Sequence, residues 1–339
     1  MDSPIASHQY EVCRPELFRA IGGPLLAVVA VGGLVHLAGI LGLLPSPKPM
    51  LDVDRTVIVR QADSSREGQP ASTILLGDSS CLMDVDTPLL AELQGEDVLN
   101  LGTLSFLNLA SFGKLLQNQL TNGAASPERV VLLVHPDFVR KNSSSPAHVA
   151  ALEHYLAGTD QFYGIGGPFN LRKALGVHLI EGRLVARIPR PLFGDFGRQY
   201  GFTSRVYDYM LRNRGSALDP RTLDPEKLTG SSDYRVASAH KKGAPDFGSV
   251  VPEGIKLYVG LTPLPESFPT DRYPEDFRKL AKELAGLFPG AVPLVDLPPT
   301  LPDDQFANKT HLRPEARASF TGRLHEVLKS APEDLSGTL

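Results

Sequence analysis

The sequence predicts an α/β fold, a doubly wound parallel sheet with helices on both faces, which follows an N-terminal transmembrane helix. Three observations carry this prediction. Short apolar runs alternate with amphipathic helical segments from residue 73 to residue 330. The run at 129–134, RVVLLV, is nearly all apolar, as in a parallel strand buried on both faces. Residues 20–44 contain no Asp, Glu, Lys or Arg.

The apolar segment is long enough to span a membrane, because a helix of about 20 apolar residues crosses the hydrocarbon core. We expect an uncleaved single-pass anchor at residues 20–45, preceded by a short tail at 1–19. The sequence Ser-Pro-Lys-Pro that follows at 46–49 is a poor cleavage site for a signal peptidase. Basic residues flank both ends of the segment, so the positive-inside rule leaves the orientation open.

The next segment, residues 46–71, is rich in Pro, Asp, Ser and Arg, and we expect a linker there. A single domain is predicted over residues 72–330, before a C-terminal tail at 331–339. Its strands are expected at residues 73–76, 98–101, 129–134, 255–261 and 292–295. Its helices are expected at residues 87–93, 106–120 and 276–287, and from Pro314 onward, where proline suits a first helical position.

A long insertion, residues 143–250, interrupts the alternation of strands and helices and exceeds the length of a connecting loop. Helical stretches are predicted within it at 147–156 and 171–185. Between residues 172 and 221 it carries ten Lys or Arg against four Asp or Glu. Two interpretations remain open: a face that meets anionic lipid or an acidic polymer, and a solvated surface with local ion pairs.

The amino-acid composition indicates which classes of partner and cofactor the sequence supports. The chain is 42% hydrophobic and 21% charged, which is typical of a folded protein. A net charge of −4, 7% aromatic residues and no tryptophan give no support to a nucleic-acid partner. Only two cysteines occur, with no C-x-x-C pair, so we expect neither a metal site nor a cofactor.

The candidate chemistry begins where the predicted strand 73–76 ends, at Gly77-Asp78-Ser79. Ligands of open α/β sheets bind at the carboxyl ends of the strands. A serine hydroxyl becomes an effective nucleophile when a base accepts its proton, and His311 is the candidate base. We expect Asp78 to brace the turn rather than to react.

Three segments together resemble the conserved blocks of the SGNH (GDSL-type) hydrolases: Gly77-Asp78-Ser79, Asn100-Leu101-Gly102, and His311 before a Pro-Glu-Ala helix start. The resemblance is strongest to the membrane-anchored branch, which includes alginate O-acetylation proteins and the D-alanyl transfer protein of teichoic acids. It implies a flavodoxin-like three-layer fold. It also implies an oxyanion hole made of the Ser79 and Gly102 backbone N–H groups and an asparagine of the third block.

Two departures from the family pattern stand out. The third block contains Val-His-Pro-Asp at 134–137, without asparagine. Either the oxyanion site has one donor fewer, or His135 or Asn108 serves instead. Asn308 stands where the family has the aspartate that orients the histidine. Either the Asn308 amide accepts the imidazole N–H, in which case Asn308→Asp should keep or raise activity, or Asp303 or Asp304 reaches in.

The resemblance implies a serine acyl esterase or O-acyltransferase that acts on acyl groups, chiefly acetyl, of a cell-envelope or exported polysaccharide. It further implies a single pass through the cytoplasmic membrane, a catalytic domain on the periplasmic side, and a membrane-bound acyltransferase partner. Two alternatives stay open. One is a catalytically degenerate scaffold or polymer-binding component, and the other is a lipid esterase.

Overall fold

The computed structural model describes residues 14–40, 53–123, 125–141, 144–157, 203, 205–219, 234–268 and 272–331. These residues belong to two compact units. The first unit contains helix α1 (Arg14–Ile40), and the second contains the sheet. The predicted helical stretch at 171–185 lies outside the described residues.

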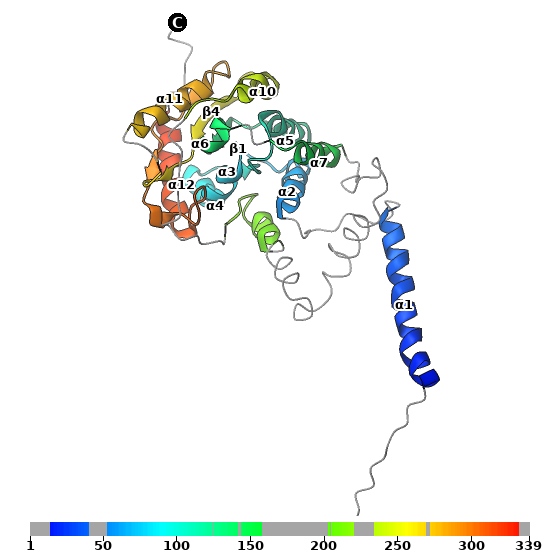
Figure 1. The fold of residues 1–339 in the computed structure, drawn as a ribbon. Coiled ribbons are helices and arrows are strands. Elements are labelled where there is room, and N and C mark those ends of the chain that lie inside the picture. Colours follow the sequence, from blue (N-terminus) through cyan, green and yellow to red (C-terminus); the bar gives the residue numbers. More distant parts are fainter. Residues whose placement is uncertain are drawn as a thin grey trace, which may run out of the picture. The chain divides into compact units, whose positions relative to one another are not determined.

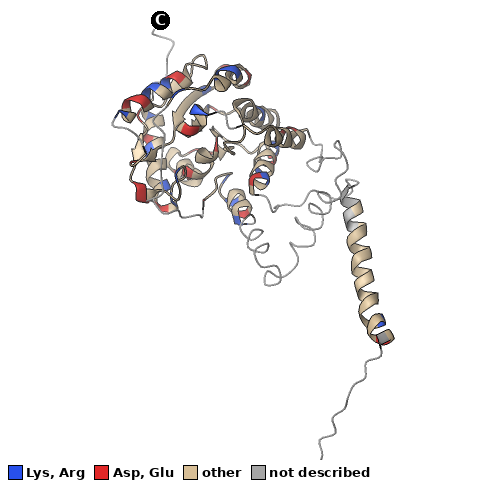
Figure 2. Ribbon diagram, in the orientation of Figure 1, with Lys and Arg blue, Asp and Glu red and all other residues tan. Residues whose placement is uncertain are grey.

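Helix α1 is 27 residues long and has charged side chains only in its first turns (Figure 2). Its stretch Pro15–Leu34 has a mean hydropathy of 1.8, and none of it is buried by other parts of the chain. It is the one helix among the described residues that is long and apolar enough to cross a membrane. The apolar helix expected from the sequence is therefore present, and it begins at Arg14, six residues earlier than expected.

Five parallel strands form the sheet of the second unit, in the order β2-β1-β3-β4-β6. Figure 1 shows β1 and β4 of this sheet with helices around them. The parallel α/β sheet predicted from the sequence is confirmed. The strands are β1 (Thr73–Gly77), β2 (Val98–Asn100), β3 (Arg129–Val134), β4 (Lys256–Leu261) and β6 (Val292–Pro293). A separate two-stranded sheet pairs β5 (Leu264–Pro265) with β7 (Thr300–Leu301).

The chain reverses its direction across the sheet after β2, which is how a doubly wound sheet places helices on both faces. Helix α4 packs against α12, whereas α5 packs against α2 and α10. The helices are α2 (Val53–Glu67), α3 (Ser79–Asp84), α4 (Thr87–Gln94), α5 (Leu109–Asn122), α6 (Pro136–Arg140), α7 (Pro146–Leu156), α10 (Ser238–Gly248), α11 (Tyr273–Ala285) and α12 (Pro314–Ser330).

Helix α2 differs from the linker predicted at residues 46–71. Ten consecutive residues of the helix, 56–65, are buried. The polar side chains of this segment predicted exposure to solvent, but Gln61 is buried and finds its partners inside the protein. The Gln61 side-chain amide donates to the backbone oxygens of Asn100, Gly102 and Gly215, at 3.1, 2.6 and 3.2 Å. Helix α2 thus belongs to the core and supports two segments that lead to the candidate site.

Within the insertion, residues 205–219 pack against the first helix after β1. The Ala217 N–H donates to the Leu82 carbonyl oxygen at 2.9 Å, and the Ser216 hydroxyl donates to the Val85 carbonyl oxygen at 2.7 Å. The Arg317 guanidinium also donates to that carbonyl oxygen, at 2.8 Å. These bonds hold the insertion beside α3, where the candidate nucleophile lies. Most of the basic segment 172–221 is not among the described residues.

Candidate active site

The nucleophile candidate, Ser79, is the first residue of α3, directly after a tight turn. At Gly77 the chain comes so close to β3 that a β-carbon would lie 1.8 Å from the Leu133 carbonyl oxygen, so only glycine fits. Asp78 follows as the N-cap of α3. The turn therefore places the Ser79 hydroxyl at the carboxyl edge of the sheet.

The predicted base reaches this hydroxyl from the far end of the sequence. His311 lies in the loop just before α12, and its Nε2 atom is 2.9 Å from the Ser79 Oγ atom. This distance is within the range of a hydrogen bond between a nucleophile and its base. The structure brings the two residues together across 232 positions of sequence.

The partner of the other imidazole nitrogen is Asp219, which the sequence analysis missed. The His311 Nδ1 atom lies 2.8 Å from Asp219 Oδ2, and the Asp219 side chain is only 1% exposed. Ser79, His311 and Asp219 form the hydrogen-bonded series found in catalytic triads, in which the carboxylate accepts the Nδ1 proton and fixes the tautomer. Asp219 comes from the insertion, where it seemed to be one of four acidic residues among ten basic ones.

Asn308 is in the site, but its contacts differ from those predicted. Its side-chain oxygen accepts from the backbone N–H groups of Thr310 and His311, at 2.9 and 3.1 Å, and from the Thr310 hydroxyl at 2.9 Å. Its amide nitrogen donates to Asp219 Oδ2 at 2.7 Å. The oxygen therefore faces the loop backbone, and Asp219 rather than Asn308 accepts the imidazole N–H. Asn308 positions both the carboxylate and the histidine loop.

The two upstream aspartates lie away from this arrangement. Asp304, the predicted substitute for the orienting group, is exposed. Asp303 begins a short 3₁₀ turn, Asp303–Gln305, and its Oδ1 atom accepts the Ser267 backbone N–H at 3.0 Å. Asp219, rather than Asp303 or Asp304, is the carboxylate that orients His311.

Asp78 is fully enclosed and bonds to the turn and to the neighbouring strand end. Its Oδ1 atom accepts the Ser80 N–H and the Ser80 hydroxyl at 3.1 and 2.6 Å, and its Oδ2 atom accepts the His135 N–H at 3.2 Å. Burial raises the pKa of Asp78, and these hydrogen bonds oppose the rise. Asp78 therefore braces the turn and joins it to the end of β3.

Gly102 packs against α3, but its N–H does not face the nucleophile as the resemblance implied. The Gly102 N–H donates to Asn100 Oδ1 at 2.8 Å. A β-carbon at position 102 would lie 2.7 Å from the Leu82 nitrogen, so glycine is required for packing. The absence of a side chain at Gly102 therefore serves the packing of this segment against α3.

His135 follows β3 and is buried, with 4% exposure. Its Nδ1 atom accepts the Asp137 backbone N–H at 3.1 Å, whereas its Nε2 atom is buried and has no hydrogen-bond partner among the described residues. Burial is the main cause that lowers the pKa of His135 to about 3. The Asp137 charge opposes this shift, and the charges of His311 and Lys309 add to it. The ring is therefore neutral near pH 7.

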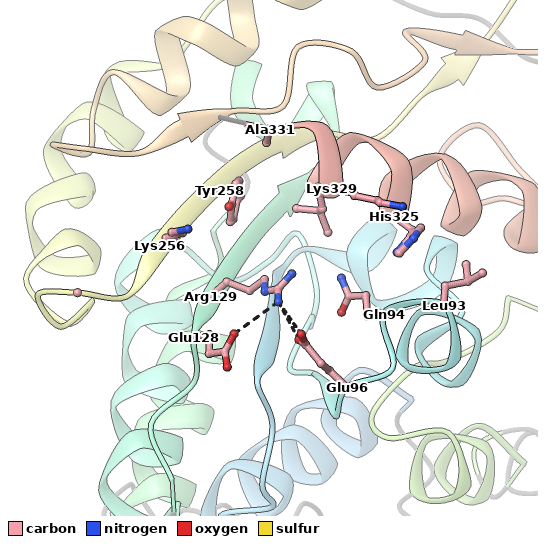
Figure 3. Close-up of a pocket in the computed structure, with 12 residues that line it drawn as sticks. Leu93, Gln94, Glu96, Glu128, Arg129, Lys256, Tyr258, His325, Lys329 and Ala331 are labelled. Carbon is pink, nitrogen blue, oxygen red and sulfur yellow. Dashed lines mark hydrogen bonds and ion pairs between the residues drawn. The ribbon is translucent and has the colours of Figure 1, made fainter. Parts of the chain in front are cut away.

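A cavity of about 630 Å³ lies at the opposite edge of the sheet and is separate from the candidate site (Figure 3). It is lined by Arg129 and Lys256, which begin β3 and β4, and by His325 of α12. The Arg129 guanidinium is already paired with Glu96 at 2.8 Å. Within the described residues, no three His, Cys, Asp or Glu side chains gather in a way that could hold a metal ion.

No family model, curated protein or solved structure matches this chain. A function for this chain is therefore proposed from the geometry around Ser79.

Proposed function

We propose that this chain is a serine acyl-transfer enzyme, an esterase or O-acyltransferase that works through an acyl-enzyme on Ser79. The observation that carries the proposal is the hydrogen-bonded series from Asp219 through His311 to Ser79, with separations of 2.8 and 2.9 Å. A nucleophile, a base and an orienting carboxylate in this order can perform acyl transfer on unrelated folds.

Each residue has a defined part in the reaction. His311 Nε2 accepts the Ser79 proton as Oγ bonds to the ester carbonyl carbon, and Asp219 stabilises the imidazolium that forms. The tetrahedral intermediate then expels the alcohol, which takes its proton from His311. Water or a sugar hydroxyl next gives its proton to His311 and attacks the acyl carbon, and Ser79 regains its proton as the acyl group leaves.

The proposed substrate is an acyl group, chiefly acetyl, on a cell-envelope or exported polysaccharide. Two features support this class: the resemblance of the three sequence blocks to the membrane-anchored SGNH branch, and the apolar exposed helix α1. The same features support an inner-membrane protein with its catalytic unit on the periplasmic side and a membrane-bound acyltransferase as partner. No cofactor enters this scheme.

The catalytic interpretation is better supported than the degenerate scaffold. That alternative rests on the neutral Asn308 in place of an aspartate and on the missing asparagine of the third block. Asp219 supplies the carboxylate from another part of the chain, and Asn308 donates to it at 2.7 Å. A scaffold without catalysis gives no reason for this buried arrangement.

Active-site labelling tests the proposal. The full-length chain in detergent micelles is treated with a fluorophosphonate probe and separately with a chromogenic acetyl ester. We expect covalent labelling and ester turnover in the wild type and in Ser249→Ala, an exposed serine control in the turn after α10. Both should be lost in Ser79→Ala. A wild type that is neither labelled nor active, or labelling that persists in Ser79→Ala, would contradict the proposal.

The substrate class needs its own comparison. We expect kcat/KM to be higher for acetylated oligosaccharides than for short-chain lipid esters of the same acetyl content. The opposite order would identify a lipid esterase that uses the same serine.

A further inference from the structure

His135 is close to the nucleophile through direct contacts between two neighbouring strand ends. Strands β1 and β3 are paired with Gly77 opposite Leu133, so the residues after them leave the sheet side by side. The His135 N–H donates to Asp78, the residue before Ser79, at 3.2 Å. The positive charge of His311 also contributes to lowering the pKa of His135.

The protonation state of the His135 ring follows from its hydrogen bond. Nδ1 accepts the Asp137 N–H at 3.1 Å, so it carries a lone pair and not a proton. The proton of the neutral ring is therefore on Nε2. This N–H is a buried donor without an acceptor among the described residues, an arrangement that calls for an explanation.

Among the described residues, the donors that the resemblance implied for an acyl-transfer reaction are only partly available. The negative oxygen of the tetrahedral intermediate needs hydrogen-bond donors already in place. The Ser79 N–H has no acceptor among the described residues and can serve. The Gly102 N–H is bonded to Asn100 Oδ1. Asn108 is the N-cap of α5, where its side-chain oxygen accepts the Ser111 N–H at 2.9 Å.

We propose that His135 is a catalytic residue whose Nε2–H donates a hydrogen bond to the substrate's carbonyl oxygen. This inference rests on the proposed function, because it concerns the same acyl transfer at Ser79. As Ser79 Oγ bonds to the carbonyl carbon, the electron pair of the C=O π bond moves to the oxygen, and His135 stabilises it without losing its proton. The buried ring strengthens the bond, since hydrogen bonds are stronger in surroundings of low dielectric.

Two substitutions at position 135 separate donation from packing. His135→Leu removes the donor, and His135→Gln keeps an amide N–H near the position of Nε2. We expect His135→Leu to lower kcat for the chromogenic acetyl ester by about 10²–10³-fold, with KM nearly unchanged, as for other oxyanion donors. His135→Gln should stay within about tenfold of the wild type, since it retains a donor. His325→Leu, at the opposite edge of the sheet, is the control and should have no effect (Figure 3).

The results distinguish this inference from the proposed function. An active wild type together with an undiminished, folded His135→Leu would overturn the role of His135 alone. A wild type without Ser79-dependent turnover would overturn both. If His135→Leu does not fold, as judged by its thermal midpoint, the kcat of the folded His135→Gln variant decides whether His135 acts as a donor. Retained kcat supports donation, and a loss as large as 10²–10³-fold contradicts it.

Discussion

At the scale of single residues, the chemistry of the site depends on a carboxylate that comes from the insertion. Asp219 is buried, and it accepts hydrogen bonds from both His311 and Asn308. It keeps the imidazole in the tautomer that can accept the Ser79 proton. The first two predictions concern this carboxylate and the amide beside it.

Asp219→Asn should lower kcat by about 10⁴-fold, the effect of the equivalent change in one serine protease. The amide cannot stabilise the imidazolium and favours the wrong tautomer of His311. The measurement is ester turnover at saturating substrate, with Asp304→Asn as the exposed control that should keep full activity. A loss smaller than about tenfold would show that Asp219 does not orient the base.

Asn308→Asp should also reduce activity, by roughly 10–100-fold, because it removes a hydrogen bond to a charged group. It would also place a second carboxylate against Asp219, and two adjacent carboxylates compete for one proton. From the sequence alone the opposite outcome was expected. Steady-state kinetics at pH 7 decide between the two, and wild-type activity in this variant would mean that the amide is not needed.

Sequence patterns could identify Ser79 and His311 because each lies in a short local motif at the edge of a strand or helix. They could not identify Asp219. It lies 92 positions before His311 in a divergent insertion, and burial alone distinguishes it from a surface acid. The resemblance implied that the Gly102 N–H faces the oxyanion, and sequence could not show that this glycine instead packs against Leu82 of α3.

At the scale of elements, a buried carboxyl at the end of α3 anchors the histidine loop. Asp84 Oδ1 accepts the Leu312 N–H at 2.8 Å, next to the base His311, and its Oδ2 atom has no partner among the described residues. Burial raises the pKa of Asp84 well above its usual 3.8. The Leu312 bond and the Arg317 charge oppose the rise, and Asp78 and Asp219 add to it.

This pKa shift makes stability depend on pH. The pKa of Asp84 is higher in the folded chain than the value of about 3.9 in the unfolded chain. Its contribution to stability is therefore full below about pH 4 and is lost as the pH rises through the folded pKa. Asp84→Asn keeps the acceptor for Leu312 and removes the buried charge. We expect its thermal midpoint to exceed that of the wild type at neutral pH and to match it near pH 4.

The control for Asp84→Asn is Asp246→Asn, which changes an exposed carboxylate on α10 and should leave the pH dependence unaltered. The thermal midpoint of Asp84→Asn could instead lie below that of the wild type by the same amount at both pH values. That result would contradict a raised pKa of Asp84 in the folded chain.

Most strands and helices could be predicted because their apolar residues follow a regular period. Strand β3 begins and ends where expected, and α12 begins at the proline expected for it. Helix α2 could not be predicted, because its buried face includes Thr56, Gln61 and Ser64. Such residues indicate exposure to solvent unless their hydrogen-bond partners are known, which for Gln61 are backbone carbonyl groups far along the chain.

At the scale of the whole molecule, α1 is long and apolar enough to cross a membrane, and we propose that it anchors the chain there. Replacing both Val28 and Val31 with arginine should move the chain from the membrane pellet to the soluble fraction. Each central arginine costs about 2.5–3.5 kcal/mol on insertion scales. The double change to leucine is the control and should stay with the membranes after a carbonate wash. Retention of the arginine variant in the pellet would show that α1 is not the anchor.

The most direct test of the account is detection of the acyl-enzyme itself. The full-length chain is mixed with the chromogenic acetyl ester, quenched in acid and digested, and its peptides are weighed by mass spectrometry. We predict one acetyl group on the Ser79 hydroxyl, absent from Ser79→Ala. An acetyl group on another residue, or none on any peptide while the ester is consumed, would contradict the account.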